Sequence, residues 1–207
     1  MKKSISICLA VLIAFSLTAC GSSSAGEVKF ESRSDIEAKL TNYKITVEFT
    51  DEAGNKTEMT EMRCDQGYIW IIGESMLYIE YGTGKQYTLY RENKSGIATK
   101  LDDDGSYKTF GTVISAYLFF YNSYINFDIT RSGSEKIAGR NTTGYKFKTG
   151  EYENKFWADN EYGVTMKYNI KTSTQTGAME VKELKVGGVT LDEMVDLSEY
   201  DIADLSG

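Results

Sequence analysis

The chain contains no histidine and no proline. Without histidine it lacks the side chain whose ordinary pKa suits proton transfer near neutral pH, and which most often activates a serine or cysteine nucleophile. Without proline no residue interrupts strand pairing, while 15 tyrosines and 9 phenylalanines favour β-strands. The composition therefore favours a β-rich, non-catalytic protein over an enzyme.

Basic side chains are also scarce, with 23 lysines and arginines against 30 aspartates and glutamates. The sequence has no basic stripe that could release counterions from phosphate, which excludes nucleic acid as a partner. It also has no Gly-x-Ser-x-Gly motif, no phosphate-binding glycine loop and no cluster of cysteine and histidine. We expect no catalytic residue, no metal and no cofactor.

One acidic stretch, Asp102-Asp103-Asp104-Gly105, invites comparison with a calcium loop. In the EF-hand spacing Lys100 would occupy the first ligand position and Gly111 the last, and neither residue can serve there. We interpret the stretch as a solvated turn. A hydrolase whose catalytic carboxylates follow no known motif stays open as an alternative function.

The N-terminus has the pattern of a secretory signal peptide. Lys2 and Lys3 precede an apolar run over residues 5–15, and small residues follow. A transmembrane helix needs about 20 apolar residues, whereas the run over residues 5–19 is shorter and contains Ser6, Ser16 and Thr18. The pattern predicts cleavage and a mature chain outside the cytoplasm.

The run ends in Leu17-Thr18-Ala19-Cys20, which resembles the lipobox of bacterial lipoproteins. In that family the cysteine receives a diacylglyceryl group, with palmitate among the expected acyl chains, and becomes the first residue of the mature protein. The resemblance implies lipidation of Cys20 and anchorage at the extracytoplasmic face of a cell membrane. A Gram-positive cytoplasmic membrane is favoured and an outer membrane stays open. The alternative is an ordinary signal peptide in which Cys20 has no special role.

These patterns divide the chain into four parts. Residues 1–19 are the signal peptide, 20–33 the lipidated cysteine with a flexible Gly/Ser linker, 34–200 a single β-rich domain, and 201–207 an acidic tail. Cys8 leaves with the signal, so Cys64 has no partner for an internal disulfide. An acidic domain does not attract anionic headgroups, so the lipid must make the link to the membrane.

Two groups of strands are predicted, most of them from alternating apolar and polar residues. Residues 68–72 and 76–81 are instead apolar on both faces, which predicts central strands that are covered on both sides. Ser34 with Glu37 forms a capping box that predicts a short helix through Leu40. The opposite parity of Met59 and Met62 predicts a bulge. The first group covers residues 44–50, 56–64, 68–72, 76–81, 86–91 and 97–101. The second covers residues 145–148, 155–158, 164–170 and 179–186.

A helical period appears between the two groups, over residues 107–124. This predicts one main helix, apolar enough to be buried on most of its surface and to cover the sheet. In residues 179–186 another change of parity predicts a second bulge, and Thr190 with Glu193 predicts a short terminal helix. The acidic end, residues 196–207, is expected to be frayed.

The predicted fold class is β-rich α+β: a strongly bent antiparallel sheet, an incomplete barrel of about ten strands, covering one main helix and short terminal helices. The second half of the chain contains a Gly-Arg turn, an aromatic strand, a Trp-x-Asp segment and a strand that begins at glycine: Ile137-Ala138-Gly139-Arg140, Tyr145-Lys146-Phe147, Phe156-Trp157-Ala158-Asp159 and Gly163-Val164-Thr165-Met166-Lys167-Tyr168. With these segments the order of elements resembles the LolA/LolB-like lipoprotein carriers. A closed lipocalin-like barrel or a sandwich is the alternative.

The resemblance implies a cavity between sheet and helices that holds a lipid, an acyl chain or another apolar ligand. Its walls would include Ile45, Val47, Phe49, Tyr117 and Tyr121. The alternative is a non-catalytic lipoprotein of the cell envelope with a filled core, which contacts an unidentified protein partner through its acidic face.

Overall fold

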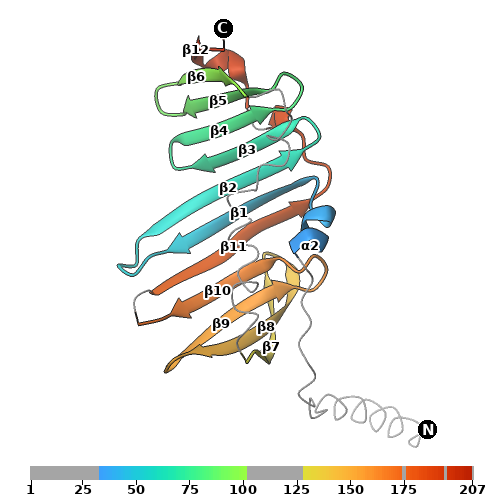
Figure 1. The fold of residues 1–207 in the computed structure, drawn as a ribbon, viewed down its shortest axis with the longest axis vertical. Helices are drawn as coiled ribbons and strands as arrows, with labels where there is room; N and C mark the ends of the chain where they lie inside the picture. The colour runs from blue at the N-terminus through green and yellow to red at the C-terminus, as the bar shows by residue number, and fades with distance from the viewer. Residues whose placement is uncertain (1–32, 102–127, 174–175, 194, 207) are drawn as a thin grey trace, which may run out of the picture.

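The computed structural model describes residues 33–101, 128–173, 176–193 and 195–206. Their strands form one sheet of 12 strands in the order β12-β6-β5-β4-β3-β2-β1-β11-β10-β9-β8-β7 (Figure 1). Neighbouring strands are antiparallel, except that β12 runs parallel to β6. The sheet is open, with β12 and β7 at its two edges, so the predicted β-rich, unclosed sheet is confirmed.

The first six strands follow one another along the chain as a meander, as predicted. Each lies within two residues of its predicted bounds. They are β1 (Tyr43–Thr50), β2 (Lys56–Cys64), β3 (Gly67–Ile72), β4 (Ser75–Glu80), β5 (Lys85–Tyr90) and β6 (Ser95–Lys100).

The other half of the sheet contains four predicted strands and two that were not predicted. The predicted ones are β8 (Arg140–Thr149), β9 (Tyr152–Asp159), β10 (Thr165–Lys171) and β11 (Thr176–Val186). The edge strand β7 (Thr130–Ile137) was missed because all its residues except the last are exposed, so it has no apolar alternation. The prediction of a frayed acidic end is wrong for β12 (Asp201–Asp204), whose backbone pairs with β6.

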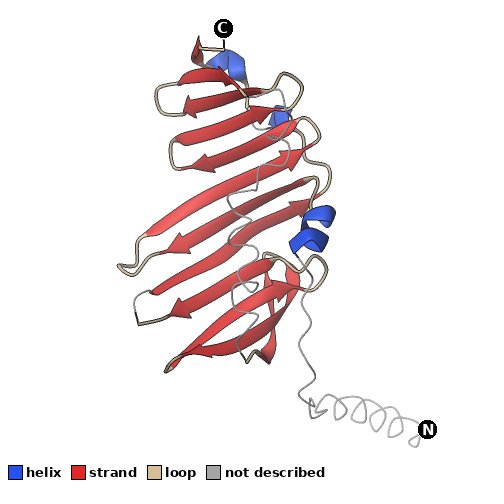
Figure 2. Ribbon diagram, viewed as in Figure 1, coloured by secondary structure: helices blue, strands red, loops and turns tan. Residues whose placement is uncertain are grey.

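Helices are few in the described part of the chain (Figure 2). The predicted short helix is α2 (Arg33–Lys39), and two 3-10 turns, η3 (Leu191–Glu193) and η4 (Leu197–Glu199), lie near the C-terminus. The predicted main helix, residues 107–124, lies outside the described residues. Among the helices that are described, none has the length and apolar character needed to cross a membrane.

One predicted bulge is wrong and the other is confirmed. Along β2 the register with β1 and β3 is unbroken, so Met59 and Met62 simply lie on opposite faces. In β11 the register against β1 shifts between Val181 and Glu183, which accounts for the change of parity there.

Both faces of the sheet carry a core, and this explains why apolar residues of both parities are buried. On one face, here called the α2 face, Ile36 and Leu40 from and just after α2 pack on β1 and on strands β8 to β11. On the other face, here called the C-terminal face, residues that follow β11 cover β2 to β6. Met59 belongs to the first core and Met62 to the second.

The chain reaches the C-terminal face through a turn at Gly187 and Gly188, whose φ values of 79° and 64° favour glycine. The side chain of Asn42 accepts from the Val189 N–H at 3.0 Å and donates to its carbonyl at 3.1 Å. These bonds fix the start of the segment. Val189 and Leu191 are then buried against the second core.

Candidate functional site: an uncharged face of the sheet

The α2 face of strands β3 to β6 carries no charged residue. The strand registers align twelve side chains there in three rows across the four strands, and we call them the neutral face. The rows are Tyr68, Ile79, Gln86 and Thr99; Trp70, Leu77, Thr88 and Ile97; and Ile72, Ser75, Tyr90 and Ser95. Because 26% of all residues are charged, so large an uncharged area marks this face as a candidate binding surface.

Burial varies across the neutral face. Tyr68 and Ile79 are buried. The central apolar side chains Trp70, Ile72 and Leu77 are only half-buried. Trp70 and Ile72 also pack against the core beneath α2. The face therefore offers partly accessible apolar surface that is continuous with that core.

A buried carboxylate borders this surface. Glu61 on β2 is fully buried and lies in register between Ile45 and Trp70 on the α2 face. The Tyr43 hydroxyl donates a hydrogen bond to its Oε1. Burying a carboxylate is costly unless donors surround it. Arg63, two residues further along β2, lies on the same face as Glu61.

Two further polar groups, the indole of Trp70 and the hydroxyl of Tyr81, lie near Glu61. The indole Nε1–H of Trp70 is buried and has no hydrogen-bond partner among the described residues. Burial raises the pKa of the Tyr81 hydroxyl, and the charge of Arg63 opposes that shift. The border of the neutral face therefore combines an acceptor, Glu61, with a buried donor, Trp70, that has no acceptor among the described residues.

Three of the predicted wall residues lie next to this surface. Ile45 and Val47 are fully buried in the core beneath α2, and Phe49 is half-buried against the same core. Tyr117, Tyr121 and the lipidation residue Cys20 lie outside the described residues. The ligand contacts predicted for these residues stay predictions.

Sequence reasoning missed Glu61 and Trp70. A weak signal was present, because Glu61 has the same parity as the apolar Met59, but Thr57 and Arg63 share that parity. Trp70 lies in a stretch that is apolar at both parities, so alternation could not assign its face. Only the register of β2 with β3 brings the two residues together.

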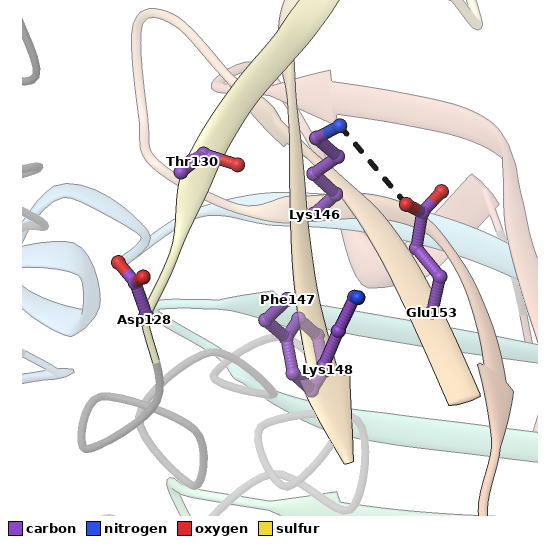
Figure 3. A pocket seen from close by; sticks show the side chains of 6 residues that line it. All are labelled: Asp128, Thr130, Lys146, Phe147, Lys148 and Glu153. Carbon is purple, nitrogen blue, oxygen red and sulfur yellow. Dashed lines mark ion pairs between the residues drawn. The ribbon is translucent and has the colours of Figure 1, made fainter. Parts of the chain in front are cut away.

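A surface pocket of about 230 Å³ lies near the β7 edge (Figure 3). Lys146 and Glu153 form its one ion pair among the residues drawn, with Nζ and Oε2 4.0 Å apart, and both side chains are nearly half exposed. Exposed pairs of this kind contribute little free energy. The pocket is lined by Asp128, Thr130, Lys146, Phe147, Lys148 and Glu153.

The motif residues Arg140 and Asp159 meet beside a second pocket, of about 460 Å³. Arg140 donates from Nε to Asp159 at 2.9 Å and from Nη2 to Glu161 at 2.7 Å. Burial opposes the charge of Arg140, but the hydrogen bond to Asp159 raises its pKa overall. The backbone N–H of Tyr162 also donates to Asp159. These groups largely satisfy one another, so the cluster joins two turns rather than presenting free ligands.

In the described ranges, no three histidine, cysteine or acidic side chains come together in a way that could hold a metal ion. Asp102, Asp103 and Asp104 lie outside those ranges. Cys64 is buried at the end of β2 and packs in the second core.

Comparisons with known proteins give fold similarities only. No family model matches the chain, and no curated protein matches it. A conserved uncharacterized protein from Thermus thermophilus is 7% identical, with 83% of this chain and 95% of that chain covered, at a TM-score of 0.45.

MucB, solved also with MucA from Pseudomonas aeruginosa, is 12% identical at a TM-score of 0.46, with 81% of this chain covered. The chain spans 61% of the length of that MucB structure. A domain assigned to outer membrane lipoprotein sorting from Vibrio parahaemolyticus is 8% identical, covers 77% and 93% of the two chains, and has a TM-score of 0.26. Because all three TM-scores are below 0.5, we base no functional conclusion on them.

Proposed function

We propose that the chain is an extracytoplasmic lipoprotein, anchored through Cys20, whose neutral face binds an apolar or amphipathic ligand. The N-terminal signal and lipobox support the anchor. The ligand-binding part of the proposal rests on the neutral face, where the half-buried side chains of Trp70, Ile72 and Leu77 form an uncharged surface next to a packed core. Apolar surface of this kind gains free energy when a ligand removes it from water.

The polar border favours an amphipathic ligand over a pure hydrocarbon. An unsatisfied buried donor costs about 1–3 kcal/mol, and a carbonyl or carboxylate of a ligand would satisfy the Trp70 Nε1–H. The hydrocarbon part would then lie along Ile72 and Leu77. A fatty acid or a single-chain phospholipid has both parts.

Intrinsic fluorescence tests this proposal directly, because Trp70 and Trp157 are the chain's two tryptophans. In mature Cys20→Ser protein carrying Trp157→Phe, Trp70 is the remaining reporter. We expect oleic acid and lysophosphatidylcholine to change its emission saturably. In the matched Trp70→Phe protein, Trp157 is on the charged side of β9 beside Lys167 and should not respond. A Trp70 signal that stays flat, or equal responses from both reporters, contradicts the proposal.

The second candidate is a non-catalytic envelope protein with a filled core. It is favoured by Ile45 and Val47, which have no exposed surface and pack beneath α2 instead of lining an open cavity. Crosslinking in intact cells separates the two functions. Recovery of one specific protein partner, together with failure to load any amphiphile, favours this candidate.

A further inference from the structure

The described residues include three exposed large apolar side chains, and all three lie at the same corner of the sheet. Tyr90 is 43% exposed, Ile97 39% and Leu205 65%. Tyr90 ends β5, Ile97 lies in β6, and Leu205 follows β12 at the edge (Figure 1). We call these three residues the corner patch.

The strand registers place the corner patch on the α2 face. Ser95 pairs with Tyr90 and Thr88 pairs with Ile97, so Tyr90 and Ile97 are diagonal neighbours on that face. Ala203 pairs with Ile97 across β6 and β12. The Leu205 N–H donates to the Ala98 carbonyl at 2.8 Å, which keeps Leu205 beside β6.

The two faces of this corner differ in charge. On the C-terminal side, Lys85 pairs with Asp204 at 2.7 Å and Lys94 pairs with Glu199 at 2.7 Å. On the α2 face, the strand residues of β5 and β6 are uncharged, as described above. On β12, Asp201 lies in register with Ser95 and places one carboxylate at the margin of the α2 face. The α2 side of the corner is therefore apolar at Tyr90, Ile97 and Leu205, with this one charge at its edge.

Size and position decide which partner fits. A stable protein interface uses about 20–30 residues on each side, so three side chains are too few for a second copy of the chain. The proposed anchor at Cys20 lies 13 residues before Arg33, a distance of at most about 45 Å. The five strand spacings from β1 to β6 amount to about 24 Å. The bilayer that holds the anchor is therefore within reach of the corner patch.

We propose that the corner patch inserts into the interfacial layer of the bilayer in which the Cys20 lipid is anchored. The inference rests on the proposed lipid anchor. Once the anchor is inserted, contact of the domain with the same bilayer is an intramolecular event, so a small apolar patch is sufficient. A tyrosine with an apolar ring and a polar hydroxyl suits the boundary between headgroups and acyl chains.

Depth-dependent quenching tests the proposal. The acylated full-length mature protein, carrying Trp70→Phe, Trp157→Phe and Ile97→Trp, is reconstituted in phosphatidylcholine vesicles with brominated acyl chains. We expect a large loss of Trp emission relative to unbrominated vesicles. The matched control places the reporter three residues further on, as Lys100→Trp, on the opposite face of the same strand, and should lose little emission.

The outcomes separate the inference from the anchor. Protein that floats with the vesicles but shows no selective quenching at position 97 overturns the membrane contact and leaves the anchor intact. Protein that does not float at all overturns both. Circular dichroism of each variant verifies the fold, which two substitutions at exposed strand positions should leave unchanged.

Discussion

At the scale of single residues, Glu61 is a fully buried carboxylate that lies between Ile45 and Trp70. Tyr43→Phe removes one hydrogen bond to it and leaves the packing of the ring intact. We expect a loss of about 1–3 kcal/mol in the free energy of unfolding, measured by urea denaturation. Tyr90→Phe, at an exposed tyrosine of the same sheet, is the control and should change it by less than about 0.5 kcal/mol. Equal effects of the two substitutions would contradict the assigned role of Glu61.

Gly67 tests how closely β3 packs on β4 and on the C-terminal segment. A Cβ at this position would lie 2.3 Å from the Ile79 carbonyl oxygen and 2.9 Å from Leu191 Cδ1. Since a backbone atom cannot move aside cheaply, Gly67→Ala should lower the free energy of unfolding by about 1–3 kcal/mol. Gly82→Ala is the matched control, because nothing lies within 4 Å of its Cβ. Thermal unfolding of both variants measures the difference, and a Gly67→Ala protein as stable as the control would refute the packing described here.

At the scale of elements, β12 is a short edge strand with an acid-sensitive contact. The hydrogen bond from Lys85, followed by bonds from Ser206, holds the pKa of Asp204 well below its ordinary value. A lowered folded pKa means that the contribution is full above the unfolded pKa of about 3.9 and falls as the pH drops below it. The protection factors of the amides of residues 201–204, which correct for the intrinsic slowing of exchange in acid, should therefore fall between about pH 5 and pH 2.

The control for this acid dependence is Asp204→Asn, in which the group no longer titrates. The protection factors of the β12 amides should then vary less with pH over the same range. Lys85→Met removes the main cause of the shift and should have the same effect. If the wild-type and both variants show the same pH dependence, the contact does not hold the strand.

Most strands could be predicted because they are runs of apolar residues, alternating or continuous, that turn residues separate. Strand β2, for example, has its predicted bounds although its parity changes between Met59 and Met62, and the bulge in β11 followed from a change of parity. Strand β7 escaped prediction because its exposed residues carry no periodic signal. Strand β12 escaped because an acidic, polar sequence was expected to be frayed, whereas its backbone pairs with β6.

For the whole molecule, the sequence alone could not identify the neutral face. Each of its four strands contributes three uncharged residues of one parity, but only the pairing registers show that these parities share a face. The bulge that was wrongly predicted between Met59 and Met62 has the same cause. A predicted bulge is unnecessary once the sheet is known to bury its α2 face beneath α2 and its opposite face beneath the C-terminal segment.

The same arrangement connects the two proposals. The neutral face extends from Glu61 and Trp70 to the corner patch without a charged side chain on β3 to β6. A ligand bound near Trp70 and a bilayer at Ile97 would therefore share one uncharged surface. The anchor at Cys20 would keep that surface close to the membrane.

The intact mass of the protein purified from membranes of cells expressing the full chain tests the central claim of a lipid-anchored domain most directly. We predict a chain that begins at Cys20 and carries the added mass of a diacylglyceryl group. Cys20→Ser protein should lack that mass and leave the membrane fraction. A wild-type chain that begins at another residue, or that begins at Cys20 without a lipid, would contradict the account.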